Sequence, residues 1–151
     1  MDIDVFWQEF IKAEGLSPDT EYIEAFCFDE EDKDEHLLRL VLSGVKRATC
    51  SSLKYWQWLE EPLPISGEYS IVTDREGNPK CVFKTIDVHV LPFKDMTWEM
   101  CRREGEDESL ESWINNHMNY FGKEAKMLRY EFSPDMTVVF EDFEVVYKAC
   151  I

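Results

Sequence analysis

Apolar side chains recur at helical spacing near the start of the chain. Ile3, Phe6 and Phe10 would share one face of a helix, and a glycine follows this run. The pattern predicts an N-terminal helix at about residues 2–14. Residues 22–28 alternate loosely between polar and apolar side chains, which favours a strand or an extended link.

Two further helices are predicted before residue 62. The acidic run at residues 29–36 suits a helix N-terminus, and Gly44 is the expected stop. The apolar face of this helix, between the acidic run and Gly44, is formed by Leu37, Leu38, Val41 and Leu42. Residues 53–61, LKYWQWLEE, predict a short aromatic helix that a proline-rich segment ends.

The pattern changes to alternation in the middle of the chain. Residues 67–74 and 80–93 are rich in β-forming side chains and flank a Gly-Asn-Pro turn, which predicts a hairpin. Two helices are predicted at 95–106 and 111–125, and a strand or strand pair at 136–147. Helices and strands do not alternate as βαβ units, so the fold class is α+β, in one domain over residues 1–151.

The amino-acid composition excludes several classes of partner and site. The 151 residues include 16 Lys and Arg against 32 Asp and Glu, a formal charge of −16, which repels duplex DNA and anionic membranes. Five cysteines, an odd number without CxxC spacing, argue against a disulfide framework or a zinc site. No metal or cofactor is expected. Without a secretory signal or a long apolar run, the sequence favours a cytoplasmic protein with reduced thiols.

One stretch departs from this acidic background. Residues 36–59 contain no Asp or Glu, and within them lies GVKRATCSS at 44–52. If this loop makes one helical turn, Lys46 and Thr49 share a face, and a desolvated lysine amine could reach the threonine hydroxyl. The alternative is a helix cap, in which Lys46 and Arg47 complement a helix dipole.

A second candidate segment is EGEDESLESWINNHMNYF at residues 104–121. His117 follows Trp113 by four residues and would lie on the same helical face. A packing histidine, held by hydrogen bonds, is the alternative to a ligand-binding one. The acidic residues around Glu106 are equally consistent with a solvated turn.

Together these segments resemble the ASCH domain family in their order along the chain. The resemblance covers roughly residues 24–147 and rests on a Gly-x-Lys loop, a glycine-turn hairpin, an EGE turn, a Trp-x3-His pair and a terminal strand. The stretches that carry the resemblance are FCF at 26–28, DEHLLRLVLSGVKRATCSS at 34–52, LPISGEYSIVTDREGNPKCVFKTIDVHVLPFKDMT at 63–97, EGEDESLESWINNHMNYF at 104–121 and FEVVY at 143–147.

The resemblance implies a PUA-like fold, a small mixed β-barrel with flanking helices, and places the Gly-x-Lys loop on a cleft. By analogy with other PUA-like domains it implies RNA binding. The broad family pattern is GxKxxExR. Gly44 and Lys46 match it, whereas Thr49 stands where Glu is expected and Ser51 where Arg is expected.

Some bacterial relatives resemble amidohydrolases that act on N4-acetylated cytidine, with a Lys-x-x-Thr pair and a carboxylate from a central strand. Lys46 and Thr49 match that pair as base and nucleophile, but Lys84 stands at the carboxylate position. Asp87 and Glu106 are the possible substitutes.

Three functions therefore stay open. The first is a binding domain for RNA or a nucleotide-like small molecule, with a tryptophan (Trp56, Trp58 or Trp113) stacking on a base. The second is an amidohydrolase, with a ribonuclease as a variant. The third is a protein-interaction domain without catalysis. The residues expected to contact a ligand are Gly44, Lys46, Arg47, Thr49, Ser51, Lys84, Glu106, Trp113 and His117.

Overall fold

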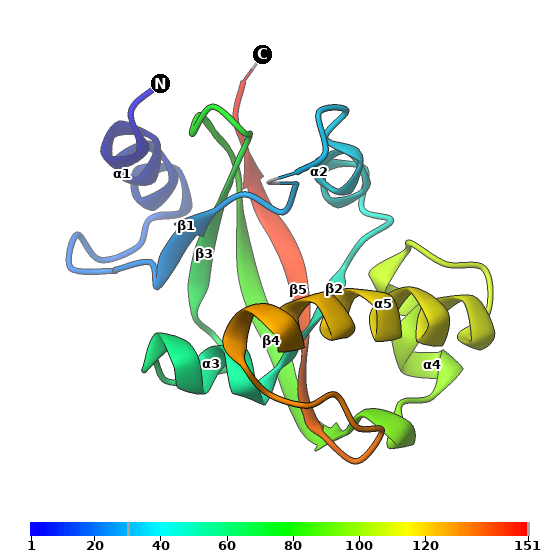
Figure 1. The fold of residues 1–151 in the computed structure, drawn as a ribbon. Helices are drawn as coiled ribbons and strands as arrows, with labels where there is room; N and C mark the ends of the chain where they lie inside the picture. The colour runs from blue at the N-terminus through cyan, green and yellow to red at the C-terminus, as the bar shows by residue number, and fades with distance from the viewer. Residues whose placement is uncertain (30, 151) are drawn as a thin grey trace.

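A computed structural model describes residues 1–29 and 31–150, with helices and strands mixed along the chain as the α+β prediction requires. Figure 1 shows a curled central sheet with α1 and α2 near one end and α3, α4 and α5 near the other. The elements are α1 (Ile3–Glu14), β1 (Glu24–Phe26), α2 (His36–Leu42), β2 (Ala48–Ser52), α3 (Leu53–Leu59), β3 (Tyr69–Thr73), β4 (Pro79–Pro92), the 3-10 turn η1 (Phe93–Asp95), α4 (Trp98–Cys101), the 3-10 turn η2 (Arg102–Glu104), α5 (Leu110–Leu128) and β5 (Thr137–Lys148).

Helix α1 confirms the N-terminal prediction. The Asp2 carboxylate caps it by accepting hydrogen bonds from the backbone N–H groups of Asp4 and Val5. Its buried face packs on the sheet at Ile71 and Val82. This burial of an amphipathic face, more than helix propensity, stabilises a helix of this length.

The sheet has the strand order β1-β3-β4-β5-β2. β1 runs parallel to β3, and the other neighbours pair antiparallel. The long strands β4 and β5 form the centre, and register shifts between Val82 and Phe83 and between Thr85 and Asp87 interrupt their ladder. Bulges of this kind increase twist and bend a sheet, which accounts for its curl into a half-barrel.

We call one side of this sheet the inner face, defined by Phe83, Thr85, Glu141 and Phe143. Phe83 stacks on Phe143 with ring centroids 4.3 Å apart, and the Thr85 hydroxyl bonds to the Glu141 carboxylate. At one end of the inner face, α2 packs against these rings through Leu38 and Val41. The other face is covered by α5, whose Trp113 and Phe121 pack on Val138 and Phe140.

Two local predictions were wrong. Residues 95–106 do not form one helix: the short helix α4 is flanked there by the 3-10 turns η1 and η2. Residues 48–52 were expected in a loop and instead form β2, because pairing with β5 satisfies their backbone. The hairpin of β3 and β4 is confirmed, and residues 137–148 form one strand. In the described part of the chain, no helix has the length and apolarity needed to span a bilayer.

Candidate functional site

The loop between α2 and β2 buries a lysine. Gly44 has a φ of 80°, a left-handed conformation that glycine adopts without steric cost. After this turn, the Lys46 side chain is only 2% exposed. Its Nζ donates to the carbonyl oxygen of Ala48 at 2.9 Å and to Oε2 of Glu106 at 2.7 Å. A buried ammonium needs such partners, since burying an unpaired charge is costly.

The EGE turn packs directly against this loop. Gly105 has a φ of 73°, and a Cβ built there would lie 2.5 Å from the Val45 carbonyl oxygen. Only glycine therefore fits at this position. The close approach of the two backbones brings the carboxylates on either side, Glu104 and Glu106, to the buried lysine.

Glu104 is the centre of a second set of buried hydrogen bonds. Its Oε2 accepts from Trp113 Nε1 at 3.2 Å and lies 3.1 Å from His117 Nε2. His117 Nδ1 lies 2.9 Å from the Trp113 carbonyl oxygen. Both ring nitrogens thus face acceptors, so the arrangement favours the doubly protonated imidazolium.

The electrostatics agree with that protonation state. Burial alone would lower the pKa of His117, but the hydrogen bond and charge of Glu104 raise it above its ordinary value. Burial would raise the pKa of Glu104, yet Lys46 and His117 hold it below the ordinary value. The site thus contains two cations and two carboxylates, Glu106 being the second, which balance one another.

This balance decides what Lys46 can do. Its amine donates to the Glu106 carboxylate, and its charge helps to hold the pKa of Glu104 down. The helical turn that would have put Lys46 and Thr49 on one face does not form, because residues 48–52 are extended. As arranged, Lys46 is a hydrogen-bond donor and a positive charge, not a free base.

Strand β2 presents its side chains to two different faces. Cys50 packs with the core under α5, where burial raises the pKa of its thiol well above the ordinary range, so it is an inert thiol. By alternation, Thr49 and Ser51 lie on the inner face. The Ser51 hydroxyl accepts a hydrogen bond from Trp56 Nε1 at 2.8 Å, which fixes the half-buried indole of α3 beside it.

Glu141 lies directly across from Thr49 in the β2–β5 register. It is 8% exposed, and its Oε2 accepts a hydrogen bond from Thr85 Oγ1 at 2.6 Å. Burial, together with the charges of Glu24 and Glu68, raises the pKa of Glu141 to about 7. Sequence reasoning missed this residue because FEDFE lies within an ordinary predicted strand, and only the register shows which residues are its neighbours.

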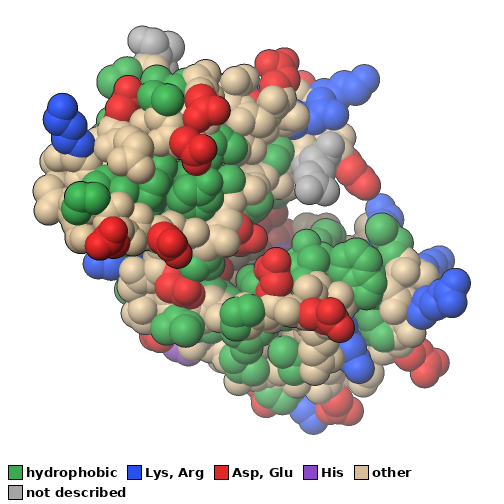
Figure 2. Space-filling model, turned by 90° about the vertical axis from the view of Figure 1, so that its left-hand side faces the viewer, with side chains coloured by type: hydrophobic (Ala, Val, Ile, Leu, Met, Phe, Trp, Pro, Cys, Tyr) green, Lys and Arg blue, Asp and Glu red, His purple; other side chains and the backbone are tan. Residues whose placement is uncertain are grey.

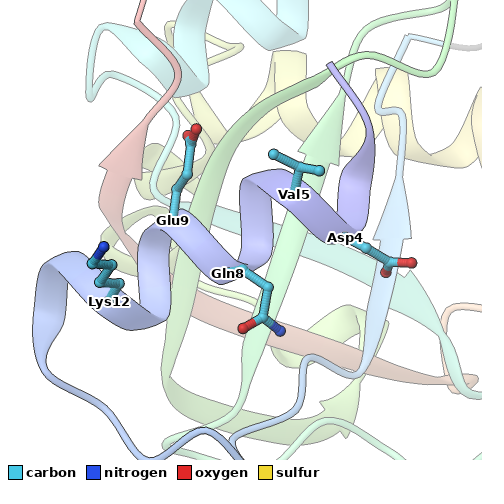
Figure 3. Close-up of a pocket in the computed structure, with 5 residues that line it drawn as sticks. All are labelled: Asp4, Val5, Gln8, Glu9 and Lys12. Atoms are coloured by element: carbon cyan, nitrogen blue, oxygen red, sulfur yellow. The ribbon is translucent and has the colours of Figure 1, made fainter.

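The surface of the molecule is hollowed on one side. Figure 2 shows the hollow on its right-hand side, between the upper part of the molecule and the lower part that carries α3 and α5. In Figure 1 this is the side on which β1 and α5 face the viewer. A separate shallow depression on α1 involves only residues of that helix, Asp4, Val5, Gln8, Glu9 and Lys12 (Figure 3).

Comparison with known proteins defines the family. The profile of the ASCH domain matches residues 24–147. The chain belongs to the ASCH domain family. The chain is similar to a crystallised protein from Enterococcus faecalis V583, with 33% identity, a TM-score of 0.87, and coverage of 97% of this chain and 88% of the other. An ASCH domain from Lactobacillus crispatus JV V101 is 28% identical, with a TM-score of 0.82 and coverage of 95% and 93%.

The α+β, PUA-like fold inferred from the sequence is therefore confirmed, with the sheet as a five-stranded half-barrel. A comparison with curated proteins found no match. The family assignment gives the ASCH domain its fold but leaves its ligand and activity to be inferred from the site.

Not every expected residue of this ASCH domain lies by the buried lysine. Lys84 lies over the ring of Tyr69, 5.8 Å from its centroid, next to the core beneath α1. Arg47 influences the carboxylates of Glu99 and Asp142 electrostatically.

The three tryptophans proposed to stack on a base differ in exposure and in contacts. Trp113 is fully buried in the core and has no surface for stacking. Trp58 is 61% exposed and stacks on Tyr55. Trp56, bonded to Ser51, is the tryptophan fixed beside the inner face.

Proposed function

We propose that this ASCH domain binds a small, nucleoside-like molecule in the hollow along the inner face of its sheet. The observation that carries the proposal is the buried Lys46, held by Glu106 and the Ala48 carbonyl. Its Nζ lies 5.5 Å from the centroid of Phe28, whose ring stacks on Phe143 of that face. An ammonium group has three N–H donors, and Glu106 and Ala48 take two of them. The third can be donated to a carbonyl oxygen of a bound base.

The surroundings favour an uncharged base over a chain of phosphates. Glu106 already neutralises Lys46, and Glu141 adds a carboxylate on the inner face. Phosphate groups would meet repulsion here, on top of the −16 formal charge of the chain. Extended RNA is therefore a weaker candidate than a nucleoside or a single unpaired base. Thr49 and Ser51 supply hydroxyl groups, and Trp56 supplies an aromatic surface beside Ser51.

A second candidate function is the hydrolysis of an acylated nucleoside. One observation favours it: Glu106 lies 2.7 Å from the Lys46 amine and so supplies a carboxylate next to the base, which Lys84 does not. For this reaction, Lys46 must pass a proton to Glu106, so that its neutral amine takes the Thr49 hydroxyl proton as Thr49 attacks the amide carbonyl. That proton then goes to the departing cytidine nitrogen, and water hydrolyses the acyl-threonine ester to release the acid. Incubation with N4-acetylcytidine tests it: cytidine released by wild type and not by Thr49→Val supports it, and equal release by both variants refutes it.

Calorimetric titration with nucleosides tests the main proposal. Uridine, cytidine and guanosine carry carbonyl oxygens on their bases and are expected to bind more tightly than adenosine, which has none. The Lys46→Met/Glu106→Gln double variant removes the donor without stranding a buried charge, and should lose at least tenfold in affinity for uridine.

The matched control is Lys54→Met, which removes an exposed lysine from the same acid-free segment. It should leave uridine affinity unchanged. Absence of binding by all four nucleosides, or equal uridine affinities in the double variant and wild type, would contradict the proposal.

A further inference from the structure

The inner face also carries a group of carboxylates without basic partners. Glu24 pairs with Ser70 in the β1–β3 register, and Ser70 pairs with Phe83 on β4. By alternation these residues and Glu68 share the face on which Glu141 lies. The charges of Glu24 and Glu68 act with burial to raise the pKa of Glu141, in agreement with their placement on this face.

No lysine or arginine neutralises this group. Within residues 1–29 and 31–150, no salt bridge involves Glu24, Glu68 or Glu141. This is unlike the balanced set around Lys46. Ionised carboxylates on one face, with Glu141 only 8% exposed, raise the free energy of the native state unless a proton or another cation neutralises them.

Ser70 provides an independent sign of a missing partner. The residue is 1% exposed, and its hydroxyl oxygen has no hydrogen-bond partner among the described residues. Buried hydroxyl groups are nearly always paired, so an orphan usually marks a place where something else binds. Because Ser70 lies beside Glu24 in the register, its side chain extends from the same face of the sheet as that of Glu24.

Aromatic rings line the same face. Phe26 and Phe28 pack edge to face with centroids 4.7 Å apart, and Phe28 stacks on Phe143. One ring already takes an ammonium group, because Lys46 Nζ lies 5.5 Å from the Phe28 centroid. Carboxylates combined with aromatic faces are the surroundings that organic cations prefer. No group of side chains in the described chain is arranged to hold a metal ion.

We propose that Glu24, Glu68, Glu141 and Ser70 form a second binding site, specific for an organic cation such as an ammonium or guanidinium group. The carboxylates neutralise the charge and accept its N–H donors, and the Ser70 hydroxyl accepts one more. The site does not include Lys46 but shares Glu141 and the inner face with the proposed nucleoside site. Agmatine binding is measured without a nucleoside, so the two proposals fail separately.

Agmatine, which carries both a guanidinium and an ammonium group, is the test probe. An NMR titration of the full isotopically labelled chain at low salt should shift the backbone amide signals of Glu24, Ser70 and Glu141. Butylurea, an uncharged analogue, should not shift them. Glu141→Gln keeps the shape and the Thr85 hydrogen bond but removes the charge, and should weaken agmatine binding about tenfold or more. Glu24→Gln, at a more exposed position, should also weaken it and guards against misfolding of the first variant.

Glu144→Gln is the matched control, since it removes an exposed charge from the same strand. It should leave agmatine affinity unchanged. Equal losses in Glu141→Gln and Glu144→Gln would mean diffuse attraction to an acidic surface, and would overturn the proposal. A chain that does not bind agmatine, or binds butylurea equally well, would overturn it too.

Discussion

Replacing Glu141 with glutamine is expected to stabilise the protein at neutral and alkaline pH. In the native state, burial and the charges of Glu24 and Glu68 raise the pKa of Glu141 to about 7, against an ordinary value of 4.5. Between these two pH values the native state keeps a proton that the unfolded chain has released. Stability contributed by this group is therefore complete below pH 4.5 and is lost as pH rises to about 7.

The magnitude follows from the difference between the two pKa values. At about 1.4 kcal/mol per pH unit, the separation of 4.5 from about 7 corresponds to about 3 kcal/mol of unfolding free energy. Glutamine has no charge to bury, and its amide oxygen can accept the Thr85 hydrogen bond. The variant should equal wild type or be slightly less stable near pH 4.5, and should gain up to about 3 kcal/mol on wild type by pH 8.

Urea unfolding of both proteins across pH 4.5–8 measures this difference directly. If the glutamine amide itself costs the same unfolding free energy at every pH, it shifts the whole curve of the variant up or down. It does not change how the unfolding free energies of the two proteins diverge as pH rises. Glu144→Gln, an exposed substitution on the same strand, should run parallel to wild type. Parallel curves for Glu141→Gln and wild type would refute the reasoning that Glu141 is buried without a cation.

Three further predictions concern the buried lysine. Gly105→Ala should cost about 1–3 kcal/mol of unfolding free energy, because its Cβ would overlap a backbone oxygen 2.5 Å away; stability equal to wild type would contradict the close packing. His117→Asn should destabilise the protein more at pH 6 than at pH 9, because a raised histidine pKa gives stability that is lost as pH rises; a pH-independent cost by chemical denaturation would contradict a charged imidazole against Glu104. Lys46→Met should cost about 3–5 kcal/mol by leaving carboxylates unpaired, and adding Glu106→Gln should recover part of it; additive losses in thermal or urea unfolding would contradict their coupling.

Much of the fold follows from side-chain periodicity. The apolar face of α1 and the β3–β4 hairpin were predictable because their patterns agree with their local turns and caps. β2 was not, since ATCSS has no marked alternation of apolar side chains and becomes a strand through pairing with β5. The prediction of one helix at residues 95–106 was wrong for a different reason. Their side-chain pattern is helical, but the helix is interrupted where Gly105 packs against Val45.

The candidate site, like the fold, was predictable from the sequence only in part. Lys46 and Glu106 were identifiable as candidates from an acid-free stretch and an EGE turn, but their 2.7 Å contact joins residues sixty positions apart. Glu141 could not be identified, because its chemistry comes from burial and from carboxylates on other strands. Lys84 and Thr85 are adjacent in sequence and lie on opposite faces, so strand direction decides which of them reaches the inner face.

The central claim is that the hollow beside Lys46 receives the base of a nucleoside. A crystal structure of the protein soaked with uridine tests it most directly. Density for the base is expected on the inner face, with one carbonyl oxygen within hydrogen-bonding distance of Lys46 Nζ. Uridine bound elsewhere on the surface, or in the hollow with its carbonyl oxygens turned away from Lys46, would contradict it.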